Sequence, residues 1–318
     1  MSELPQTANG LRHLVPRERA FSHVAMLMGG WSAEREVSLR SGAACADALE
    51  QAGYRVTRID VDRSIAERLA TLRPQVCFNA LHGRWGEDGA IQGLLECLGI
   101  PYTHSGVLPS AVAMNKVLTK RVLQAVGMPL AREAIVDRDT ALADHVMAPP
   151  YVAKPISEGS SVGVVIVKEG ANRPPAAIAS IPALEGRILV ETFIPGRELT
   201  CAVVGSVPTD VIDIVPSDKL EFYDYEAKYA PGGSVHILPA RIPEPIRDRV
   251  RRLALLAHTT LGCRGVSRSD FRYDNAKGEV IFLEINTQPG MTGTSLVPEL
   301  GAHGGLTFPE LVSWIVED

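Results

Sequence analysis

Residues 265–286 read GVSRSDFRYDNAKGEVIFLEIN, two largely apolar runs joined by a polar link with the composition of a β-hairpin. Side chains alternate across a strand, so Arg268 and Asp270 share one face, as do Glu284 and Asn286. A symmetric hairpin would place Asp270 opposite Glu284 and Arg268 opposite Asn286. The pattern therefore predicts three oxygen-bearing side chains that converge beside one guanidinium group.

Such a cluster needs a counter-charge, because neighbouring carboxylates do not both stay ionised without one. Carboxylate and amide oxygens are the ligands that Mg²⁺ takes beside substrate phosphates. We therefore interpret Asp270, Glu284 and Asn286 as metal ligands. The alternative is a purely structural salt-bridge network around Arg268.

Composition indicates an ordinary soluble enzyme. The chain has 318 residues, enough for two or three domains, with a net charge of −5 and 22% charged residues. It carries no basic stripe, which argues against nucleic acid as a partner, and no apolar run reaches the roughly 18 residues of a membrane helix.

Residues 1–20 lack the apolar core of a signal peptide and are expected to form a flexible tail. Five scattered cysteines in apolar contexts indicate reduced core thiols of a cytoplasmic protein.

The N-terminal part alternates strand and helix signals over residues 22–105. Strands are expected at 23–28, 54–61 and 76–81, and helices at about 37–49 and 88–98, the second capped by Asp88. This order predicts a parallel sheet with helices on its faces. Ligands bind beyond the carboxyl ends of such strands, so the loops 29–35 and 82–89 are the candidates for substrate contacts.

The remainder of the chain mixes helices with more numerous strands. A helix is expected at 114–126 and a second one, with an apolar stripe, from Ile246 to Ala257. Strands are expected at 151–154, 162–168, 188–191, 199–204, 211–215, 265–273 and 280–285. The segment 217–236 is long, polar and rich in aromatic residues, which is typical of an active-site lid.

Residues 154–163, KPISEGSSVG, form a candidate phosphate loop between two β-type runs. Its N–H groups and hydroxyls suit an anion, and Lys154, Lys116 and Lys228 are candidates to neutralise phosphates. The loop also fits the Gly-x-Ser-x-Gly pattern of serine esterases, with Ser161 as the nucleophile. That motif needs a helix directly after the serine, whereas a strand is predicted there, which disfavours an esterase. A plain hairpin turn is the other alternative.

Further segments occur in a definite order: GGWSAEREVS (29–38), LHGRWGEDG (81–89), MNK (114–116), the loop 154–163, FYDYEAKY (222–229), EIN (284–286), PGMT (289–292) and SLVP (295–298). Together they resemble the D-alanine–D-alanine ligases of the ATP-grasp superfamily, from about residue 22 to the C-terminus. The resemblance implies an α/β (α+β) ATP-grasp fold. An N-terminal parallel-sheet domain (21–105) would precede two α+β domains that clamp ATP (106–192 and 193–318).

The resemblance also implies an activity. One D-alanine carboxylate would attack the γ-phosphate of ATP, and the amine of a second D-alanine would displace phosphate from the acyl phosphate, giving D-alanyl-D-alanine for peptidoglycan precursors. Two Mg²⁺ ions are expected, with Mn²⁺ as a substitute and K⁺ as an activator. The protein is expected to be a cytoplasmic homodimer without nucleic-acid or membrane partners.

Carried over to this sequence, the resemblance assigns a role to each matched residue. Asp270, Glu284 and Asn286 would hold the Mg²⁺ ions. The ATP pocket would be lined by Lys116, Lys154, Glu191, Ile194, Glu198, Phe222 and Lys228, with Ser160 and Ser161 over the phosphates. Glu34, with His82 nearby, would bind the first D-alanine. Arg268 and the Gly290 N–H would stabilise the oxyanion, and Ser295 with the Leu296 N–H would receive the second carboxylate. Tyr229 would bond to Ser160, closing the lid and linking it to Glu34 as a proton route.

Structural alternatives stay open for several of these residues. Glu34 fits equally a carboxylate in the first turn of a helix, His82 an ordinary loop histidine, and Glu191 with Glu198 strand-end surface carboxylates. The functional alternatives are a D-alanine–D-lactate or D-serine ligase, the esterase, and a nucleotide-binding module without catalysis. The segment EAKY at 226–229 resembles the dipeptide-forming branch.

Overall fold

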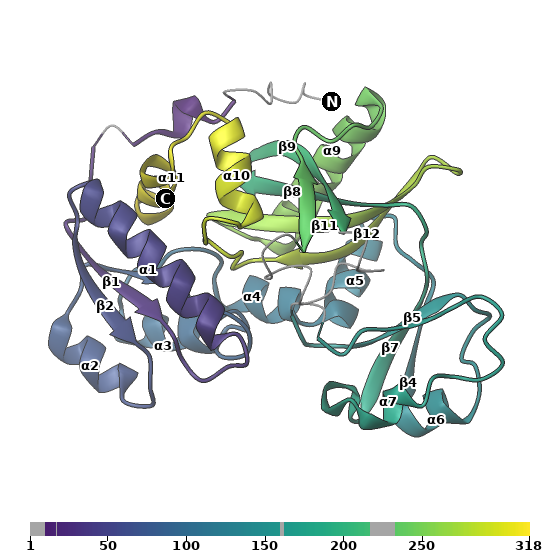
Figure 1. Ribbon diagram of the computed structural model, residues 1–318. Helices are drawn as coiled ribbons and strands as arrows, with labels where there is room; N and C mark the ends of the chain where they lie inside the picture. The colour runs from purple at the N-terminus through teal and green to yellow at the C-terminus, as the bar shows by residue number, and fades with distance from the viewer. Residues whose placement is uncertain (1–9, 17, 160–161, 217–232) are drawn as a thin grey trace.

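The structure is a computed structural model that describes residues 10–16, 18–159, 162–216 and 233–318. Five candidate residues lie outside them: Ser160, Ser161, Phe222, Lys228 and Tyr229. Within the described residues the chain forms three sheets, one parallel and two antiparallel, flanked by helices (Figure 1). The mixed α/β architecture expected from the sequence is confirmed.

The N-terminal sheet is parallel, with β1 (His23–Met28) between β2 (Arg55–Asp60) and β3 (Val76–Asn79). Alternate residues of β1 enter different cores: Val24 and Met26 pack on the side of α1 (Arg35–Gln51), whereas Ala25 and Leu27 pack toward α2 (Ile65–Leu72) and α3 (Ala90–Leu98). The βαβ prediction is thus confirmed. Gly89, and not the expected Asp88, is the N-terminal cap residue of α3; Asp88 Oδ1 accepts the Ala90 N–H at 3.1 Å.

The single helix expected at 114–126 is wrong, because two helices, α4 (Val107–Met114) and α5 (Lys116–Gln124), meet at Asn115. Asn115 is extended (φ −98°, ψ 100°), and its side chain accepts the Leu118 N–H at 3.0 Å. The Lys116 N–H donates to the Ile156 carbonyl at 2.9 Å. The start of α5 is therefore tied to the candidate phosphate loop.

The central sheet has the order β4-β7-β5-β6, with antiparallel neighbours. Its strands are β4 (Glu133–Asp137), β5 (Tyr151–Pro155), β6 (Val165–Val167) and β7 (Arg187–Thr192), accompanied by α6 (Arg138–Ala143), α7 (Ala177–Ser180) and a short 3-10 turn, η2 (Pro182–Leu184). The sequence did not predict β4, and β6 is shorter than expected. A strand, not a helix, follows the loop 154–163, so the esterase elbow geometry is missing from the described residues there.

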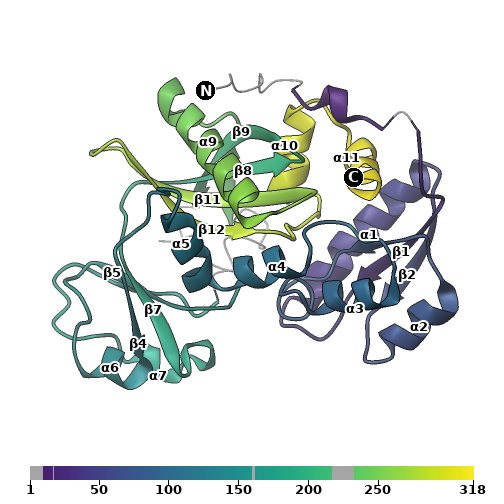
Figure 2. The same cartoon turned by 180° about the vertical axis from the view of Figure 1, so that it is seen from behind.

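The C-terminal sheet has the order β10-β9-β8-β11-β12, also antiparallel. Its strands are β8 (Arg197–Val204), β9 (Val207–Pro216), β10 (Ser234–Ile237), β11 (Val266–Asp274) and β12 (Glu279–Asn286). Helix α9 (Glu244–Leu261) packs on one face together with α4 and α5 (Figure 2). Helices α10 (Leu296–His303) and α11 (Phe308–Glu317) pack on the other face, and α11 also contacts α1. Residues 234–236, expected in the irregular segment, belong to β10.

The first residues described do not form the expected flexible tail. Leu11 is 1% exposed and joins the core that α10 and α11 share with α1, next to the 3-10 turn η1 (Arg12–Leu14). Its N–H donates to the Gly304 carbonyl at 3.0 Å, and Arg12 lies 3.2 Å from Glu310. Apolar burial therefore anchors the chain at this point.

All five cysteines are free thiols, as expected. Cys45, Cys77 and Cys201 are core residues, whereas Cys97 is exposed and Cys263 half-buried, so the expectation of core thiols is wrong for Cys97. Among the described residues, no helix combines the length and the apolar character needed to cross a bilayer.

Candidate active site

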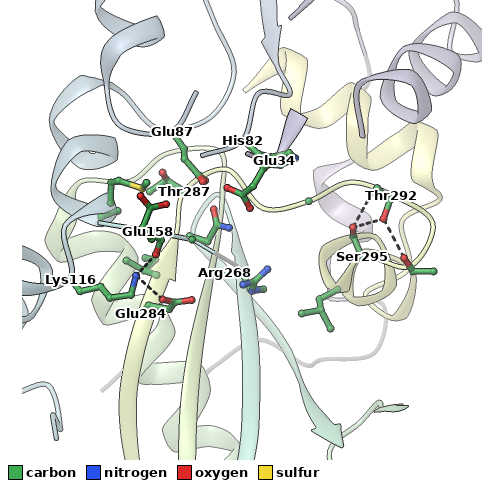
Figure 3. Close-up of a pocket in the computed structure, with 18 residues that line it drawn as sticks. Glu34, His82, Glu87, Lys116, Glu158, Arg268, Glu284, Thr287, Thr292 and Ser295 are labelled. Carbon is green, nitrogen blue, oxygen red and sulfur yellow. Dashed lines mark hydrogen bonds and ion pairs between the residues drawn. The ribbon is translucent and has the colours of Figure 1, made fainter. Parts of the chain in front are cut away.

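The β11–β12 hairpin pairs in the register expected from its sequence. Arg268 lies opposite Asn286 and Asp270 opposite Glu284, and a bulge follows between Asp270 and Phe271. Directly opposed residues in an antiparallel pair have Cβ atoms about 5 Å apart. The hairpin therefore brings two carboxylates, an amide and a guanidinium group to one region of a deep cleft, and Figure 3 shows Arg268 and Glu284 in this cleft.

Arg268 is engaged with the neighbouring acid on its own strand. Its Nε and Nη2 donate to the two oxygens of Asp270 at 3.0 and 2.7 Å, a bidentate pair. The Thr200 hydroxyl donates to Asp270 Oδ1 at 2.6 Å. The salt bridge of the structural alternative is thus present. Arg268 nevertheless lines the cleft, so its pairing does not remove it from the site.

Lys116 joins the hairpin to the phosphate loop. Its Nζ lies 3.3 Å from Glu284 Oε2 and donates to the Glu158 carbonyl at 2.6 Å (Figure 3). Lysine at the first position of α5 therefore provides a positive charge between a carboxylate on β12 and the backbone of the loop, where a phosphate chain would need one.

Glu34 and His82 approach the cleft from the loops that follow β1 and β3 (Figure 3). A Cβ on Gly83 would lie 2.8 Å from Glu34 Oε2, and one on Gly159 would lie 3.3 Å from the same oxygen. The carboxylate thus packs against both loops, which only glycine permits at this distance. His82 is buried, and burial lowers its pKa to about 4, so the imidazole is neutral at pH 7.

Glu87 is a site residue that the sequence argument missed. Its Oε1 accepts the Gly83 N–H at 2.8 Å, and its side chain lines the cleft beside Glu34 (Figure 3). Burial, and then the nearby Glu34 carboxylate, raise its pKa to about 8. The available signal was its position inside the motif 81–89, in which only His82 was taken as a candidate site residue.

The opposite wall of the cleft is the start of α10. Ser295 precedes the helix, and its Oγ accepts the Thr292 N–H at 2.9 Å (Figure 3). A Cβ on Gly290 would lie 3.0 Å from that Oγ, so the position suits glycine. Leu296 supplies the first helical N–H, and helix N-termini favour anions.

A second chamber lies behind the first, between the central and C-terminal sheets. Glu191 and Glu198 are 4% and 9% exposed, which rules out the alternative that they are surface carboxylates. Burial alone would raise the pKa of Glu191, but the ammonium groups of Lys154 and Lys120 lower it further than burial raises it. Glu191 is therefore an ionised acceptor. Lys120 was not recognised from the sequence.

Every described candidate residue lines one of the two chambers, and Lys116 and Glu284 line both. These residues are Glu34, His82, Lys116, Lys154, Glu191, Ile194, Glu198, Arg268, Asp270, Glu284, Asn286, Gly290, Ser295 and Leu296. The arrangement offers an elongated ligand a buried carboxylate at one end, cations at its centre and helix N–H groups at the other end.

The donor set Asp270, Glu284 and Asn286 fits a hard divalent cation by its chemistry, because all its ligand atoms are oxygens. Arg268 and Lys116 now contact the two carboxylates, and Asn286 Oδ1 accepts the Gln288 N–H at 2.7 Å. Within the described part of the chain, no three or more His, Cys, Asp and Glu side chains gather as a metal site. The proposed set has two carboxylates and one amide.

Comparison with protein families gives two matches. Residues 63–105 match the model described as "D-ala D-ala ligase N-terminus", and residues 122–317 match "D-ala D-ala ligase C-terminus". Among curated proteins, a D-alanine–D-alanine ligase of Xanthobacter autotrophicus is 61% identical over 300 residues, which are 93% of this chain and 97% of that protein. D-alanine–D-alanine ligase B of Mesorhizobium japonicum is 57% identical over the same shares.

Solved structures give the same picture. A D-alanine–D-alanine ligase of Bacillus anthracis superposes with a TM-score of 0.79 at 29% identity, covering 93% of this chain and 96% of that one. The same enzyme complexed with ATP has a TM-score of 0.78 at 26% identity, with the same coverage. VanG D-Ala:D-Ser ligase of Enterococcus faecalis has a TM-score of 0.78 at 27% identity, covering 93% of this chain and 98% of that one.

Proposed function

Because the chain belongs to the D-alanine–D-alanine ligase family, we propose that its cleft joins two molecules of D-alanine at the expense of one ATP. The product, D-alanyl-D-alanine, serves peptidoglycan synthesis. The observation that carries the proposal is the convergence of all fourteen described candidate residues on two chambers that share Lys116 and Glu284. Such an arrangement suits a triphosphate running from a buried base to an acceptor carboxylate.

The chamber behind Lys154 takes the nucleotide. Ionised Glu191 accepts hydrogen bonds from the base, and the Ile194 side chain packs against it. Glu198, held 3.5 Å from Arg272, receives the ribose hydroxyls. The phosphates extend toward Lys116 and Lys154, whose charges compensate theirs. Catalysis in such a site is mostly positioning and charge stabilisation.

The oxygen donors Asp270, Glu284 and Asn286 would hold two Mg²⁺ ions, which Mn²⁺ could replace. K⁺ is proposed separately as an activator. Bound there, Mg²⁺ supplies charge neutralisation between the terminal phosphates. Arg268 and Lys116 occupy the two carboxylates in the structure described here. We infer that Arg268 leaves Asp270 when the site is loaded and turns to the reacting carboxyl group.

Glu34 pairs with the ammonium of the first D-alanine, beside neutral His82. The carboxylate of that molecule attacks the γ-phosphate, which gives an acyl phosphate and ADP. The amine of the second D-alanine then attacks the acyl carbon and phosphate leaves. Arg268 and the Gly290 N–H stabilise the oxyanion of this step, while Ser295 and the Leu296 N–H receive the second carboxylate.

Five further residues complete the proposal although they lie outside the described residues. Ser160 and Ser161 would cover the phosphates, and Phe222 and Lys228 would line the nucleotide pocket. Tyr229 would bond to Ser160 and close the lid toward Glu34. We also propose a cytoplasmic location, a homodimer, and the domain limits 21–105, 106–192 and 193–318.

The decisive assay mixes the protein with ATP, Mg²⁺ and D-alanine and measures both phosphate and dipeptide. We expect both products with D-alanine and neither with L-alanine. Their absence would end the proposal.

A D-alanine–D-lactate ligase would instead turn over D-lactate faster at neutral pH, and a D-serine ligase would prefer D-serine as the second substrate. ATP binding without turnover would indicate a binding module, and ATP-independent ester hydrolysis lost in Ser161→Ala would indicate the esterase.

The metal assignment has its own test. Calorimetry with a non-hydrolysable ATP analogue is expected to show at least tenfold weaker binding after a chelator is added. Equal affinity with and without chelator would contradict a cation held by Asp270, Glu284 and Asn286.

A further inference from the structure

Another cavity, of about 240 Å³, shares His82 with the cleft but opens elsewhere on the N-terminal domain. It lies at the carboxyl ends of β1 and β3, beside the first turns of α2 and α3. Its walls are largely apolar and are made by Val61, Ile65, Leu81, Ile91 and Leu94, with Trp31 and Trp85 at its rim. We refer to it as the tryptophan pocket. A cavity of about 150 Å³ holds benzene, so this pocket has room for one ring with a short arm.

The two indoles at the rim are unusual surface residues. Trp31 and Trp85 are 43% and 42% exposed, and their ring centroids are 6.0 Å apart with planes tilted by 48°. Trp85 has φ +77°, a conformation that bulky residues rarely adopt. Strained residues cluster at ligand-binding sites, and exposed aromatic groups beside an apolar cavity mark binding surfaces.

Each indole carries an arginine on its face. The guanidinium carbon of Arg63 lies 5.7 Å from the Trp31 ring centroid, and that of Arg84 lies 4.9 Å from the Trp85 centroid. Neither arginine has an ion pair with another described residue. Arg84 itself lines the pocket, and Arg63 lies against Trp31, which also lines it. Two exposed guanidinium groups are therefore associated with the two indoles of an apolar pocket.

Carboxylates close to the pocket do not neutralise these two arginines. Asp60 is paired with Arg35 at 2.6 Å, and Asp62 lies 3.5 Å from Arg68. An arginine fork matches a carboxylate in both charge and geometry. The mouth of the pocket is thus complementary to an anion, while its interior is complementary to an apolar group.

We propose that the tryptophan pocket binds a small organic carboxylate whose ring-sized apolar body fills the cavity and whose charged group meets Arg63 and Arg84. Hydrogen bonds connect the wall of the tryptophan pocket to Glu34, the residue proposed to bind the first D-alanine. The Ser32 hydroxyl donates to the His82 carbonyl at 2.7 Å, and the Glu34 N–H donates to Ser32 Oγ at 3.2 Å. Both Ser32 and His82 line the pocket.

Occupancy therefore acts on the loops that hold Glu34. The bound carboxylate stabilises these loops in the conformation in which Gly83 packs against the Glu34 carboxylate. This second step rests on the proposed function. It predicts a lower KM for the first D-alanine and an unchanged KM for ATP, because the nucleotide chamber is lined by other segments.

Binding is tested by calorimetry with phenylacetate, which combines a ring with a carboxylate. Phenethylamine, of similar size but cationic, and acetate, which lacks the ring, are the matched probes. We expect saturable binding of phenylacetate at one site per chain and at least fivefold weaker binding of the other two. Equal binding of phenethylamine would overturn the assignment of the arginines, and no binding of phenylacetate would overturn the site.

Variants locate the site. In Arg63→Gln/Arg84→Gln the Kd for phenylacetate is expected to rise at least fivefold, whereas in Arg40→Gln/Arg55→Gln, which removes two exposed arginines elsewhere, it stays within twofold. Leu94→Trp fills the cavity and is expected to abolish binding while circular dichroism confirms the fold. Binding that survives Leu94→Trp in a folded protein, or equal Kd values in the two arginine pairs, would overturn the proposal.

The coupling is tested in the ligase assay. Saturating phenylacetate is expected to lower the KM for the first D-alanine at least twofold, and the effect should vanish in Arg63→Gln/Arg84→Gln. An unchanged KM at a phenylacetate concentration that calorimetry shows to be saturating would overturn the coupling. Absence of dipeptide with and without phenylacetate would contradict the proposed function instead, and calorimetry would still decide whether the pocket binds.

Discussion

Lys120 places its ammonium group against the carboxylate of Glu191, and the two side chains are only 2% and 5% exposed. The same ammonium lies 2.7 Å from Glu133 Oε2, while Lys154 contacts the other oxygen of Glu191. Glu191 is thus held between two cations at the wall of the proposed nucleotide chamber. Lys120, which does not line that chamber, therefore fixes the orientation of Glu191. Recognition of the base would depend on this orientation.

Replacement of this lysine tests the arrangement. Lys120→Met keeps most of the side-chain length and removes the charge, leaving Glu133 without its cation. Loss of one partner of a buried ion pair costs about 3–5 kcal/mol, and we expect a loss of about 3 kcal/mol because Lys154 still compensates Glu191. The KM for ATP should rise about tenfold with little change in the KM for D-alanine.

The matched control is Arg121→Met, which removes a positive charge from the adjacent, exposed position of α5. Its effect on the free energy of unfolding is expected to stay within about 0.5 kcal/mol. Denaturant titration and initial-rate kinetics compare the two variants. Equal stability losses, or a KM for ATP that does not change in Lys120→Met, would show that Lys120 does not position Glu191.

Glu87 predicts a pH dependence of stability. Burial, followed by the Glu34 carboxylate, raises its pKa from an ordinary value of 4.5 to about 8. A carboxyl group whose pKa is higher in the folded protein favours folding most at low pH, and this contribution is lost as pH rises through about 8. Glu87→Gln, always neutral, escapes the loss. Relative to the parent it should gain about 4 kcal/mol between pH 5 and pH 9.

Melting curves of parent and Glu87→Gln from pH 5 to pH 9 measure this gain. Glu67→Gln is the control, since Glu67 is exposed on α2 and the same chemical change there should leave the pH profile parallel to that of the parent. A Glu87→Gln profile parallel to the parent would show that the buried carboxyl does not ionise in this range.

Glu284 lies where the two chambers meet, 3.3 Å from Lys116 and opposite Asp270. Glu284→Ala removes one carboxylate from the proposed metal site, so kcat/KM should fall by about two orders of magnitude or more, with a higher Mg²⁺ requirement. Cys201→Ser on β8, which pairs with the other side of β11, changes a core thiol and should leave kcat within about twofold. Parent-like activity of Glu284→Ala would refute the metal assignment.

The sequence predicted the β11–β12 hairpin correctly because the period of two and the polar link act locally. Strand alternation alone places four polar residues on one face of the hairpin: Arg268, Asp270, Glu284 and Asn286. Their register follows once the link closes symmetrically. The order of the motifs then predicted which loops meet in the cleft. Those predictions depended on short-range geometry and on resemblance.

Other features depend on packing between distant segments. Lys120 looks like a surface residue in the sequence and becomes buried only because α5 packs near β4 and β7. The strand β4 is a five-residue segment bounded by acids, and pairing with β7 stabilises it. Glu87 could not be recognised from the sequence either, because its raised pKa comes mainly from burial in the folded protein. Tertiary context decides such cases.

Leu11 anchors the N-terminal segment by packing on Gly304, where an added Cβ would lie 2.6 Å from the leucine Cδ1. Leu11→Ala should therefore cost about 2–4 kcal/mol of stability, as for other fully buried leucines, whereas His13→Ala at an exposed position should cost less than about 0.5 kcal/mol. Gly304→Ala tests the same contact from the other side, because the new methyl group must displace Leu11. Both variants should lower the midpoint of denaturant unfolding and leave kcat within about twofold, since Leu11 and Gly304 are absent from the lining of both chambers. A Leu11→Ala protein as stable as His13→Ala would mean that this segment contributes nothing to the core it enters.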